Sequence, residues 1–226
     1  MAGGVRRLGA RIALALALAL ACAPAMLADE FGKVSHYAVR LFSMGTLTVE
    51  TRTGDLTIVG WDDPRVVVRA RKVVRAGSAK KAGRLYPRIK VRLEGADDQV
   101  RLRTLYPPRR PWRPFRAESK LTVNFHIRMP YDAGLILHVV DGDVTLRGLT
   151  GNQKILVNYG DVEDDLSSSN FVRSLYAHTL LGTIQSDLNG ADGSGFDQKT
   201  VFWNPYGKQT VSIHVRMGGV FIYAGN

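Results

Sequence analysis

The sequence predicts a mainly β, single-domain protein made of stacked coils, as in a β-solenoid or β-helix. Apolar and polar residues alternate over most of the chain, helical periodicity is nearly absent, and similar Gly-Asp segments recur. These segments are "TGDLTIVGW" (53–61), "VVDGDVTLRG" (139–148) and "YGDVEDDL" (159–166). The alternative is a β-sandwich in which each turn closes an antiparallel hairpin. The Asp-Gly pair within "DGD" (141–143) favours that alternative, because Asp-Gly is a preferred hairpin turn.

The glycines that start successive strands set the length of the repeat. Gly142, Gly160 and Gly182 are spaced by 18 and 22 residues. A unit of about 20 residues, made of strand, turn and strand, suits a coil that buries its face on the next coil. Glycine allows the positive φ of a corner, and aspartate can bond the amides of its own turn. The predicted structural turns are Gly54, Asp55, Gly142, Asp143, Gly160, Asp161 and Gly182.

Aligning the turns gives a direct test of the coil prediction. Leu146, Asp164 and Ser186 fall at the same inward position. A lone buried carboxylate is costly, although Ser186 on a neighbouring coil could donate a hydrogen bond to it. Because Glu163 and Asp165 flank Asp164, the favoured interpretation is that this strand bends outward and the carboxylate is hydrated.

The first 28 residues are predicted to be a signal peptide outside the domain. Arg6, Arg7 and Arg11 precede the apolar run "IALALALALACAPAMLA" (12–28), which ends in small residues, a pattern typical of secretory signals. The run is short for a spanning helix, so no spanning segment is expected after its removal. Cys22 is the only cysteine. It raises lipidation as a weaker alternative to being discarded with the signal.

The rest of the chain divides into a lead-in (29–42) and one domain (43–226). Only "AGSAKKAGRLYPRI" (76–89) has the pattern of a short helix, which Pro87 would end. Charge is distributed unevenly along these residues. Residues 31–130 carry 22 Lys and Arg against 8 Asp and Glu, whereas residues 131–226 carry 6 against 10. This asymmetry favours an anionic partner for the N-terminal half, or attraction between the two halves.

Several segments resemble a bacterial family known as the putative-adhesin domain of unknown function. They are "GTLTVETRTGDLTIVGWDDPRVVVRARK", "VNFHIRMPYDAGLILHVVDGDVTLRGLTGN" and "ILVNYGDVEDDL". The resemblance covers most of residues 43–226 and implies an exported or envelope-associated domain with a solenoid-like fold. It supplies no catalytic residues. The segment "TLYPPRRPWRPFRAESK" and the later "EDD", "QSD" and "FWNPYG" depart from the family pattern.

The most distinctive candidate site is the basic Pro/Arg loop 106–116, "YPPRRPWRPFR". Its prolines keep it extended. Arginines bind phosphate, sulfate or carboxylate, and aromatic faces stack on sugars. An anion-binding loop and a solvated hairpin tip are equally consistent with the sequence. The candidate ligand-binding residues are Arg109, Arg110, Trp112, Arg113, Phe115 and Arg116.

Other chemistry-bearing residues indicate structural roles. Asp143 and Asp161 are weak metal candidates, because stacked corner aspartates could share Ca²⁺. The five histidines lack metal-ligand spacing, and Ser194 in "DGSG" lacks a nucleophile motif and is expected in a loop. Trp203 and Tyr206 are expected to cover the core. No cofactor and no metal is predicted.

The predicted function is a non-catalytic binding or structural domain, located in the periplasm or at the cell surface. Its expected partner is an anionic glycan or another acidic envelope polymer; nucleic acid fits the same chemistry but not export. One rival is a polysaccharide-acting enzyme on a β-helix, for which "EDD" (163–165) would supply carboxylates. Another is a spacer or an envelope-stress module with a protein partner. If the final strand "GGVFIYAGN" (218–226) is an open edge, it would promote self-association.

Overall fold

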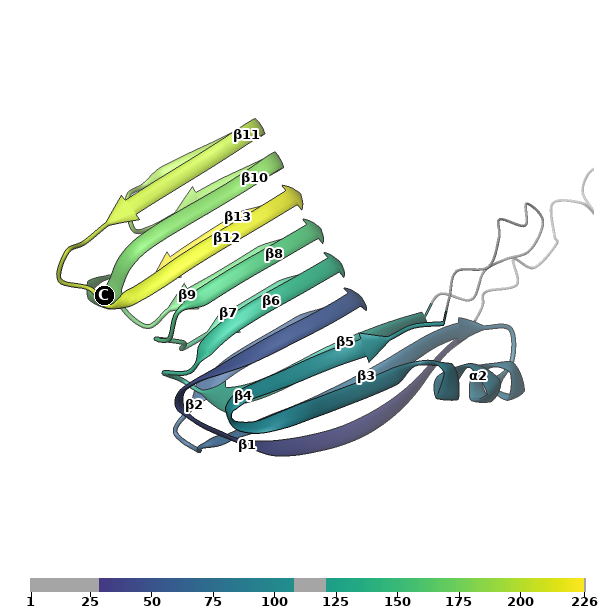
Figure 1. Ribbon diagram of the computed structural model, residues 1–226. Coiled ribbons are helices and arrows are strands. Elements are labelled where there is room, and N and C mark those ends of the chain that lie inside the picture. Colours follow the sequence, from purple (N-terminus) through teal and green to yellow (C-terminus); the bar gives the residue numbers. More distant parts are fainter. Residues whose placement is uncertain (1–28, 108–120, 226) are drawn as a thin grey trace, which may run out of the picture.

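The computed structural model describes residues 29–107 and 121–225 and confirms that the chain is mainly β (Figure 1). One short α-helix interrupts the strands, as predicted. The elements in chain order are β1 (Asp29–Thr53), β2 (Leu56–Trp61), β3 (Arg65–Ala76), α2 (Ala79–Leu85), η1 (Tyr86–Arg88), β4 (Lys90–Leu105), β5 (Leu121–Pro130), β6 (Gly134–Asp141), β7 (Val144–Arg147), β8 (Gln153–Tyr159), β9 (Val162–Leu166), η2 (Ser169–Phe171), β10 (Val172–Ser186), β11 (Ala191–Trp203), β12 (Gln209–Met217) and β13 (Val220–Ala224).

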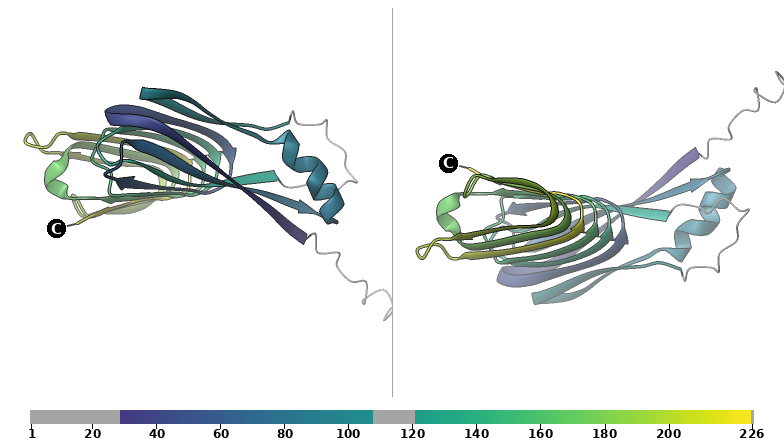
Figure 2. Two further views of the ribbon diagram at one scale, coloured as in Figure 1. Left: turned by 90° about the horizontal axis from the view of Figure 1, so that it is seen from below. Right: turned by 90° about the horizontal axis from the view of Figure 1, so that it is seen from above.

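All the strands belong to one large mixed sheet. Its order is β11-β10-β12-β8-β6-β1-β3-β5-β2-β7-β9-β13, with β4 paired to β1. Strand β10 pairs with both β12 and β13, so the sheet closes on itself at that end. Viewed from above, the later strands follow one another as nested curves, while β3 and α2 extend to the side (Figure 2).

Strands joined by a Gly-Asp corner do not pair with each other. β6 pairs in parallel with β1 and β8, and β7 pairs in parallel with β2 and β9. Each of the pairs β6–β7, β8–β9 and β12–β13 therefore forms one coil, with one strand in each of two parallel ladders. The antiparallel hairpins that the sandwich alternative places at these corners are not formed.

The N-terminal region has a different architecture. Residues 29–40, expected as a lead-in, form the first half of β1 and pair antiparallel with β3, which pairs antiparallel with β5. The predicted helix α2 lies against this sheet, where Ala82 packs with Val74 and Ala76. Ser78 caps the helix, since its hydroxyl accepts a hydrogen bond from the Lys81 amide at 3.3 Å. The sheet thus forms a separate wing beside the coils.

The core lies inside the coils, where side chains in register stack along the ladders. One fully buried row runs through five neighbouring strands from β1 to β10, and a second runs through five strands of the other ladder. Each buried aliphatic side chain contributes about 1.5–3 kcal/mol. The rows are Val49–Leu137–Ile155–Ile213–Ala177 and Leu56–Val144–Val162–Val220–Ile184.

Glycines at the corners are required by close backbone approach. Gly142 and Gly160 have φ of 151° and 129°. A Cβ on Gly160 would lie 2.3 Å from the carbonyl oxygen of Gly142, and one on Gly142 would lie 2.2 Å from that of Gly54. The backbone geometry therefore requires glycine at both corners. Gly182 differs, because it lies within β10 and faces the Gly218 carbonyl.

The corner aspartates join neighbouring coils, which corrects the expectation that each bonds its own turn. The Asp55 carboxylate accepts from the Asp143 amide at 3.3 Å, and Asp143 accepts from the Asp161 amide at 2.9 Å. Asp161 in turn accepts from the Gly219 amide at 2.6 Å. One carboxylate oxygen per coil thus anchors the backbone of the next, and charge-assisted bonds of this kind are the stronger ones.

The prediction that Asp164 is hydrated is wrong. Its side chain is only 1 % exposed, in the row Ile58–Leu146–Asp164–Ile222–Ser186. Ile222 lies between Asp164 and Ser186, so the serine cannot be its partner. Burial raises the pKa of Asp164 to about 7; the Gln153 amide opposes this effect and the charge of Asp165 adds to it. Neither carboxylate oxygen, however, has a hydrogen-bond partner of normal geometry among the described residues.

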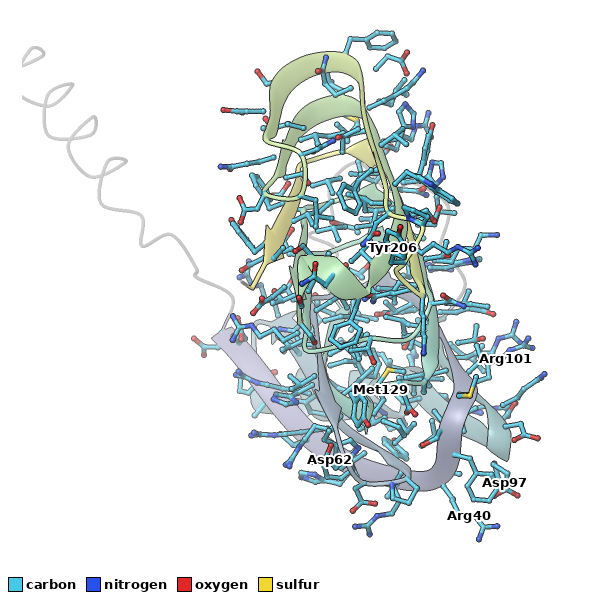
Figure 3. All side chains as sticks on the ribbon, turned by 90° about the vertical axis from the view of Figure 1, so that its left-hand side faces the viewer. Arg40, Asp62, Asp97, Arg101, Met129 and Tyr206 are labelled. Atoms are coloured by element: carbon cyan, nitrogen blue, oxygen red, sulfur yellow. The ribbon has the colours of Figure 1, made fainter. Side chains whose placement is uncertain are left out.

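The structure answers one open question for the C-terminal part and corrects two expectations. The final strand β13 is not an open edge, because it lies between β9 and β10. The "DGSG" segment belongs to strand β11 rather than to a loop. Trp203 and Tyr206 do not cover the core: they are 64 % and 91 % exposed, and Figure 3 shows Tyr206 in the turn after β11.

Candidate anion-binding face

Basic side chains gather on the outward face of the wing formed by β1, β3 and β5. In the central row His36 pairs with Arg69, which pairs with His126. Neighbouring rows add Arg71 on β3 and Arg128 on β5. Because alternate residues of a strand share a face, this register brings together side chains that are far apart in sequence. We call these five residues the basic face.

The basic face contains a shallow hollow of about 320 Å³. Four of its five lining residues are His36, Arg69, His126 and Arg128, and Val67 forms an apolar patch between them. No carboxylate lines the hollow. Arginine and histidine on a partly apolar floor can contact an anionic group together with the body of a sugar ring or a short chain.

Local contacts fix one guanidinium of this face and leave others available. Arg128 lies over the ring of Trp61 at 5.2 Å, and Trp61 is held by a 2.8 Å bond from its Nε1 to the Arg65 carbonyl. Arg71 makes only a loose ion pair with Glu30 at 3.6 Å. Within the described ranges, no carboxylate lies within 4.0 Å of Arg69 or Arg128.

Like charges lie close together on this face. Arg69 is two residues from Arg71 on β3 and diagonally across from Arg128 on β5, and like charges within reach of each other on one face of a sheet repel. Glu30 lies at one margin of this face, 3.6 Å from Arg71 and 3.8 Å from Arg75. In the other direction, Arg128 is followed in register by Val59, Arg147 and then Asp165. The uneven charge in the sequence is therefore a gradient across the molecule, and its positive end attracts anions.

The sequence-predicted ligand residues lie outside the described ranges. These are Arg109, Arg110, Trp112, Arg113, Phe115 and Arg116, and the same holds for Cys22 and the predicted signal 1–28. The residues on either side of this segment are described. Before it, the Tyr106 hydroxyl donates a hydrogen bond to the Thr53 carbonyl at 2.7 Å, and burial raises the pKa of Tyr106. Leu121 pairs with Val74 on the wing. The chain therefore re-enters the fold on the strand that carries His126 and Arg128.

The weak metal candidates Asp143 and Asp161 are engaged in the corner ladder described above. Across residues 29–107 and 121–225, no group of three or more His, Cys, Asp or Glu side chains is arranged to hold a metal ion. In the same part of the chain, no helix is both long and apolar enough to cross a bilayer.

Histidines that are scattered in the sequence meet on the outer face of the first ladder. His178 and His214 lie edge to face at 5.9 Å, and His178 Nε2 lies 2.8 Å from Asp197 Oδ1. Burial, and then the charges of His178 and Lys154, lower the pKa of His214. Sequence spacing missed this pair because its members are on β10 and β12, which pair in parallel.

The carboxylates of the "EDD" segment do not meet at one surface. Asp164 points into the core, whereas Asp165 is exposed and Glu163 partly so. Another hollow, of about 350 Å³, contains one carboxylate, Glu50, which is bonded to Arg103 at 2.9 Å. Neither location presents the pair of facing carboxylates that glycoside hydrolysis uses.

Sequence reasoning missed the basic face because it depends on strand register. The signal was nevertheless present: basic residues recur at alternate positions in "RVVVRAR" (65–71) and "NFHIR" (124–128). Alternation places them on one side of each strand. Only the pairing of β1, β3 and β5 shows that these sides form one face of the sheet.

Comparison with known proteins gives matches to solved structures only. No known family model matches the sequence, and no curated protein matches it. A "putative cell adhesion protein" from Clostridium sporogenes is 12% identical over 84% of this chain and 99% of its own, with a TM-score of 0.46. A "putative adhesin" from Bacteroides fragilis is 10% identical over 84% and 97%, with a TM-score of 0.23. A "putative lipid binding protein" from Parabacteroides distasonis is 9% identical over 86% and 97%, with a TM-score of 0.21. The chain is thus similar to bacterial proteins described as adhesins, as the sequence resemblance indicated.

Proposed function

We propose that this protein is a non-catalytic binding domain of the bacterial envelope or cell surface, which holds acidic polymers on its basic face. In this proposal the stacked coils form a β-solenoid that serves as a rigid support. The observation that carries the proposal is the register-aligned row His36–Arg69–His126, flanked by Arg71 and Arg128. The ligand class is a glycan or other polymer bearing carboxylate, phosphate or sulfate groups.

The chemistry of the face favours a polymer over a small ion. Its cationic groups spread over three strands, and neighbouring strands are about 4.8 Å apart. Each group is exposed, so one monovalent anion would gain little against water. A chain with repeated anionic groups gains from several such contacts at once. Val67 and the Trp61 ring add apolar surface suited to the non-ionic part of a sugar.

The Pro/Arg loop 106–116 extends this proposal. Arg109, Arg110, Arg113 and Arg116 would add contacts to the same polymer, because the loop leads into β5. In this proposal residues 1–28 are a signal peptide, and the remaining residues form the binding domain. Location in the periplasm or at the cell surface rests on that leader pattern, with lipid anchoring through Cys22 as the weaker alternative.

The test is binding of the purified protein to heparin and to polygalacturonate over a series of salt concentrations. The variant Arg69→Ser/Arg71→Ser/Arg128→Ser should lose affinity by at least about tenfold, because a hydrogen bond to a charged group contributes roughly 1.5–3 kcal/mol. Its salt dependence should also become shallower, since fewer ionic contacts remain. A second variant, with the four loop arginines changed to Ser, measures the contribution of the loop separately.

The matched control is Lys80→Ser/Lys81→Ser/Arg84→Ser. It removes three positive charges from exposed positions on α2. If the control loses as much affinity as the Arg69 variant, binding reflects net charge and the basic face is not the site. If neither polymer binds the unaltered protein at low salt, the proposed function is wrong.

A further inference from the structure

Strand β11 forms an open edge at one end of the stack. It pairs along its whole length with β10, from Ala191 opposite Ser186 to Trp203 opposite Ser174. Its other side pairs with no strand in the described part of the chain. The backbone N–H and C=O groups on that side are therefore available to another strand.

The opposite edge, β4, carries more charge than β11. Both edges contain a pair of positive-φ residues, Gly95 and Asp97 on β4 and Gly195 and Asp197 on β11. Arg40 holds Asp97 at 2.6 Å beside this edge, and Figure 3 shows both residues at the end of the molecule away from β11. β4 also carries a dense run of charges, whereas β11 carries only Asp192, Asp197 and Lys199. Charges are a device by which proteins block pairing at an edge, and β11 has fewer of them.

An exposed apolar row leads directly to the open edge. Tyr159, Met217, Leu181 and Phe196 are in register on four consecutive strands. They are 44 %, 43 %, 49 % and 71 % exposed, so exposure is greatest at the strand where the row ends. Contiguous exposed apolar residues mark association surfaces in soluble proteins.

We propose that β11 pairs antiparallel with β11 of a second copy of this chain, about a two-fold axis at Gln198. Within one chain Lys199 Nζ lies 3.1 Å from Asp197 Oδ2, and His178 Nε2 lies 2.8 Å from Asp197 Oδ1. In the proposed register Asp197 of each copy also lies opposite Lys199 of the other, so the two intrachain pairs join into one alternating cluster of four charges. Val201 lies opposite Gly195, and Trp203 lies opposite Gly193, so each large side chain faces a residue without one. The same surface thus meets itself, as a two-fold interface requires.

The local irregularity of β11 is compatible with this pairing. Gly195 and Asp197 have φ of 131° and 55°. Pairing with β10 nevertheless continues on both sides of this point, at Phe196 opposite Leu181 and Gln198 opposite Thr179. The strand is therefore bent but unbroken, and it keeps a usable outer edge. A partner strand placed there also covers part of Phe196.

The proposal is tested by sedimentation equilibrium of the purified protein and of charge-reversed variants. The unaltered protein should form dimers as its concentration rises. Asp197→Lys places lysines opposite each other, and Lys199→Asp places aspartates opposite each other. Each variant alone should weaken dimerisation by at least about tenfold, because like charges facing each other in an interface are strongly unfavourable.

The decisive step is to mix the two variants. In a mixed dimer every lysine again lies opposite an aspartate, so an equimolar mixture should dimerise although neither variant does so alone. Recovery of dimerisation in the mixture also shows that both variants are folded, because an unfolded chain would not form the β11 edge. Lys208→Asp, an exposed reversal outside β11, is the matched control and should leave dimerisation unchanged.

A protein that remains monomeric at all concentrations would overturn the proposal. Dimerisation that is indifferent to both reversals, or variants that do not recover on mixing, would exclude this register. None of these results bears on polymer binding by Arg69, which lies on a different part of the sheet. Failure of the dimer is therefore distinguishable from failure of the proposed function.

Discussion

The wing and the coils handle polar groups in opposite ways. In the coils, corner aspartates are bonded to the backbone of the next coil, as in the 2.6 Å contact between Gly219 N and Asp161. On the wing, Arg69 lies near Arg71 and Arg128, and in the described ranges no carboxylate lies within 4.0 Å of Arg69 or Arg128. The corners of the coils thus compensate their charges internally, whereas the wing leaves two guanidinium groups without a carboxylate partner. Such departures from local consistency are expected at functional sites.

The largest expected effect is a glycine substitution that tests whether the coils are the more tightly constrained region. Gly160→Ala should destabilise the protein by about 4 kcal/mol or more, because the new Cβ meets the Gly142 carbonyl oxygen at 2.3 Å and φ is 129°. Gly32→Ala on the wing meets only the flexible side chain of Arg71, at 3.2 Å. It should change stability by less than about 1 kcal/mol. Chemical denaturation measures the free energy of unfolding of both variants. Equal losses of stability would show that the coils are not more tightly constrained than the wing.

The second effect is a pH dependence that originates inside the coils. The pKa of Asp164 is raised by burial to about 7, so the folded protein holds a proton that the unfolded chain releases near pH 4. The contribution of Asp164 to the free energy of unfolding is therefore greatest at acidic pH, and it falls as the pH rises from about 4 to 7. A shift of this size corresponds to about 4 kcal/mol. Chemical unfolding at pH 5, 6 and 8 should show the decrease.

Two amide variants separate Asp164 from the other carboxylates. Asp164→Asn removes the titrating group at nearly constant volume and should flatten the pH dependence over this range. Asp165→Asn changes an exposed neighbour on the same strand and should leave most of the pH dependence intact. If Asp164→Asn unfolds with the same pH profile as the unaltered protein, the carboxylate is not buried in solution.

The smallest effect concerns the wing. Arg69→Thr should raise stability by a few tenths of a kcal/mol, because it removes the positive charge that lies beside Arg71 and Arg128. The same variant should bind heparin more weakly. Added salt should stabilise the unaltered protein more than the variant, since salt screens the repulsion. Thermal denaturation at low and high salt measures both effects, and a loss of stability in Arg69→Thr would show that the face is not strained.

Local features of the fold were predictable from the sequence, whereas features that depend on long-range pairing were not. The corners at Gly142 and Gly160 follow from residues adjacent in sequence. The burial of Asp164 was misjudged from its charged neighbours Glu163 and Asp165. In a strand those neighbours point to the opposite face, so their charge says nothing about the residue between them. The inward alignment with Leu146 was the better guide, and it was confirmed.

The candidate site was only partly predictable for the same reason. The charge of the N-terminal half is visible in the sequence, but its concentration on one face requires the antiparallel pairing of residues 29–40 with β3. No local pattern specifies that partner. The sequence likewise left open whether the final strand is an edge. The structure places it inside the sheet, because the chain inserts β12 and β13 between the earlier coils and β10.

This insertion has a consequence for how the molecule is assembled. The hairpin of β10 and β11 has no strand partner in the rest of the sheet except β12 and β13. During synthesis or passage across a membrane, the hairpin emerges before the residues that attach it. Until residues 209–224 arrive, the coil of β8 and β9 exposes one side of its backbone and its apolar row. The unfinished chain is therefore most prone to aggregate just before completion, and the last segment delivered is the one that ends that exposure.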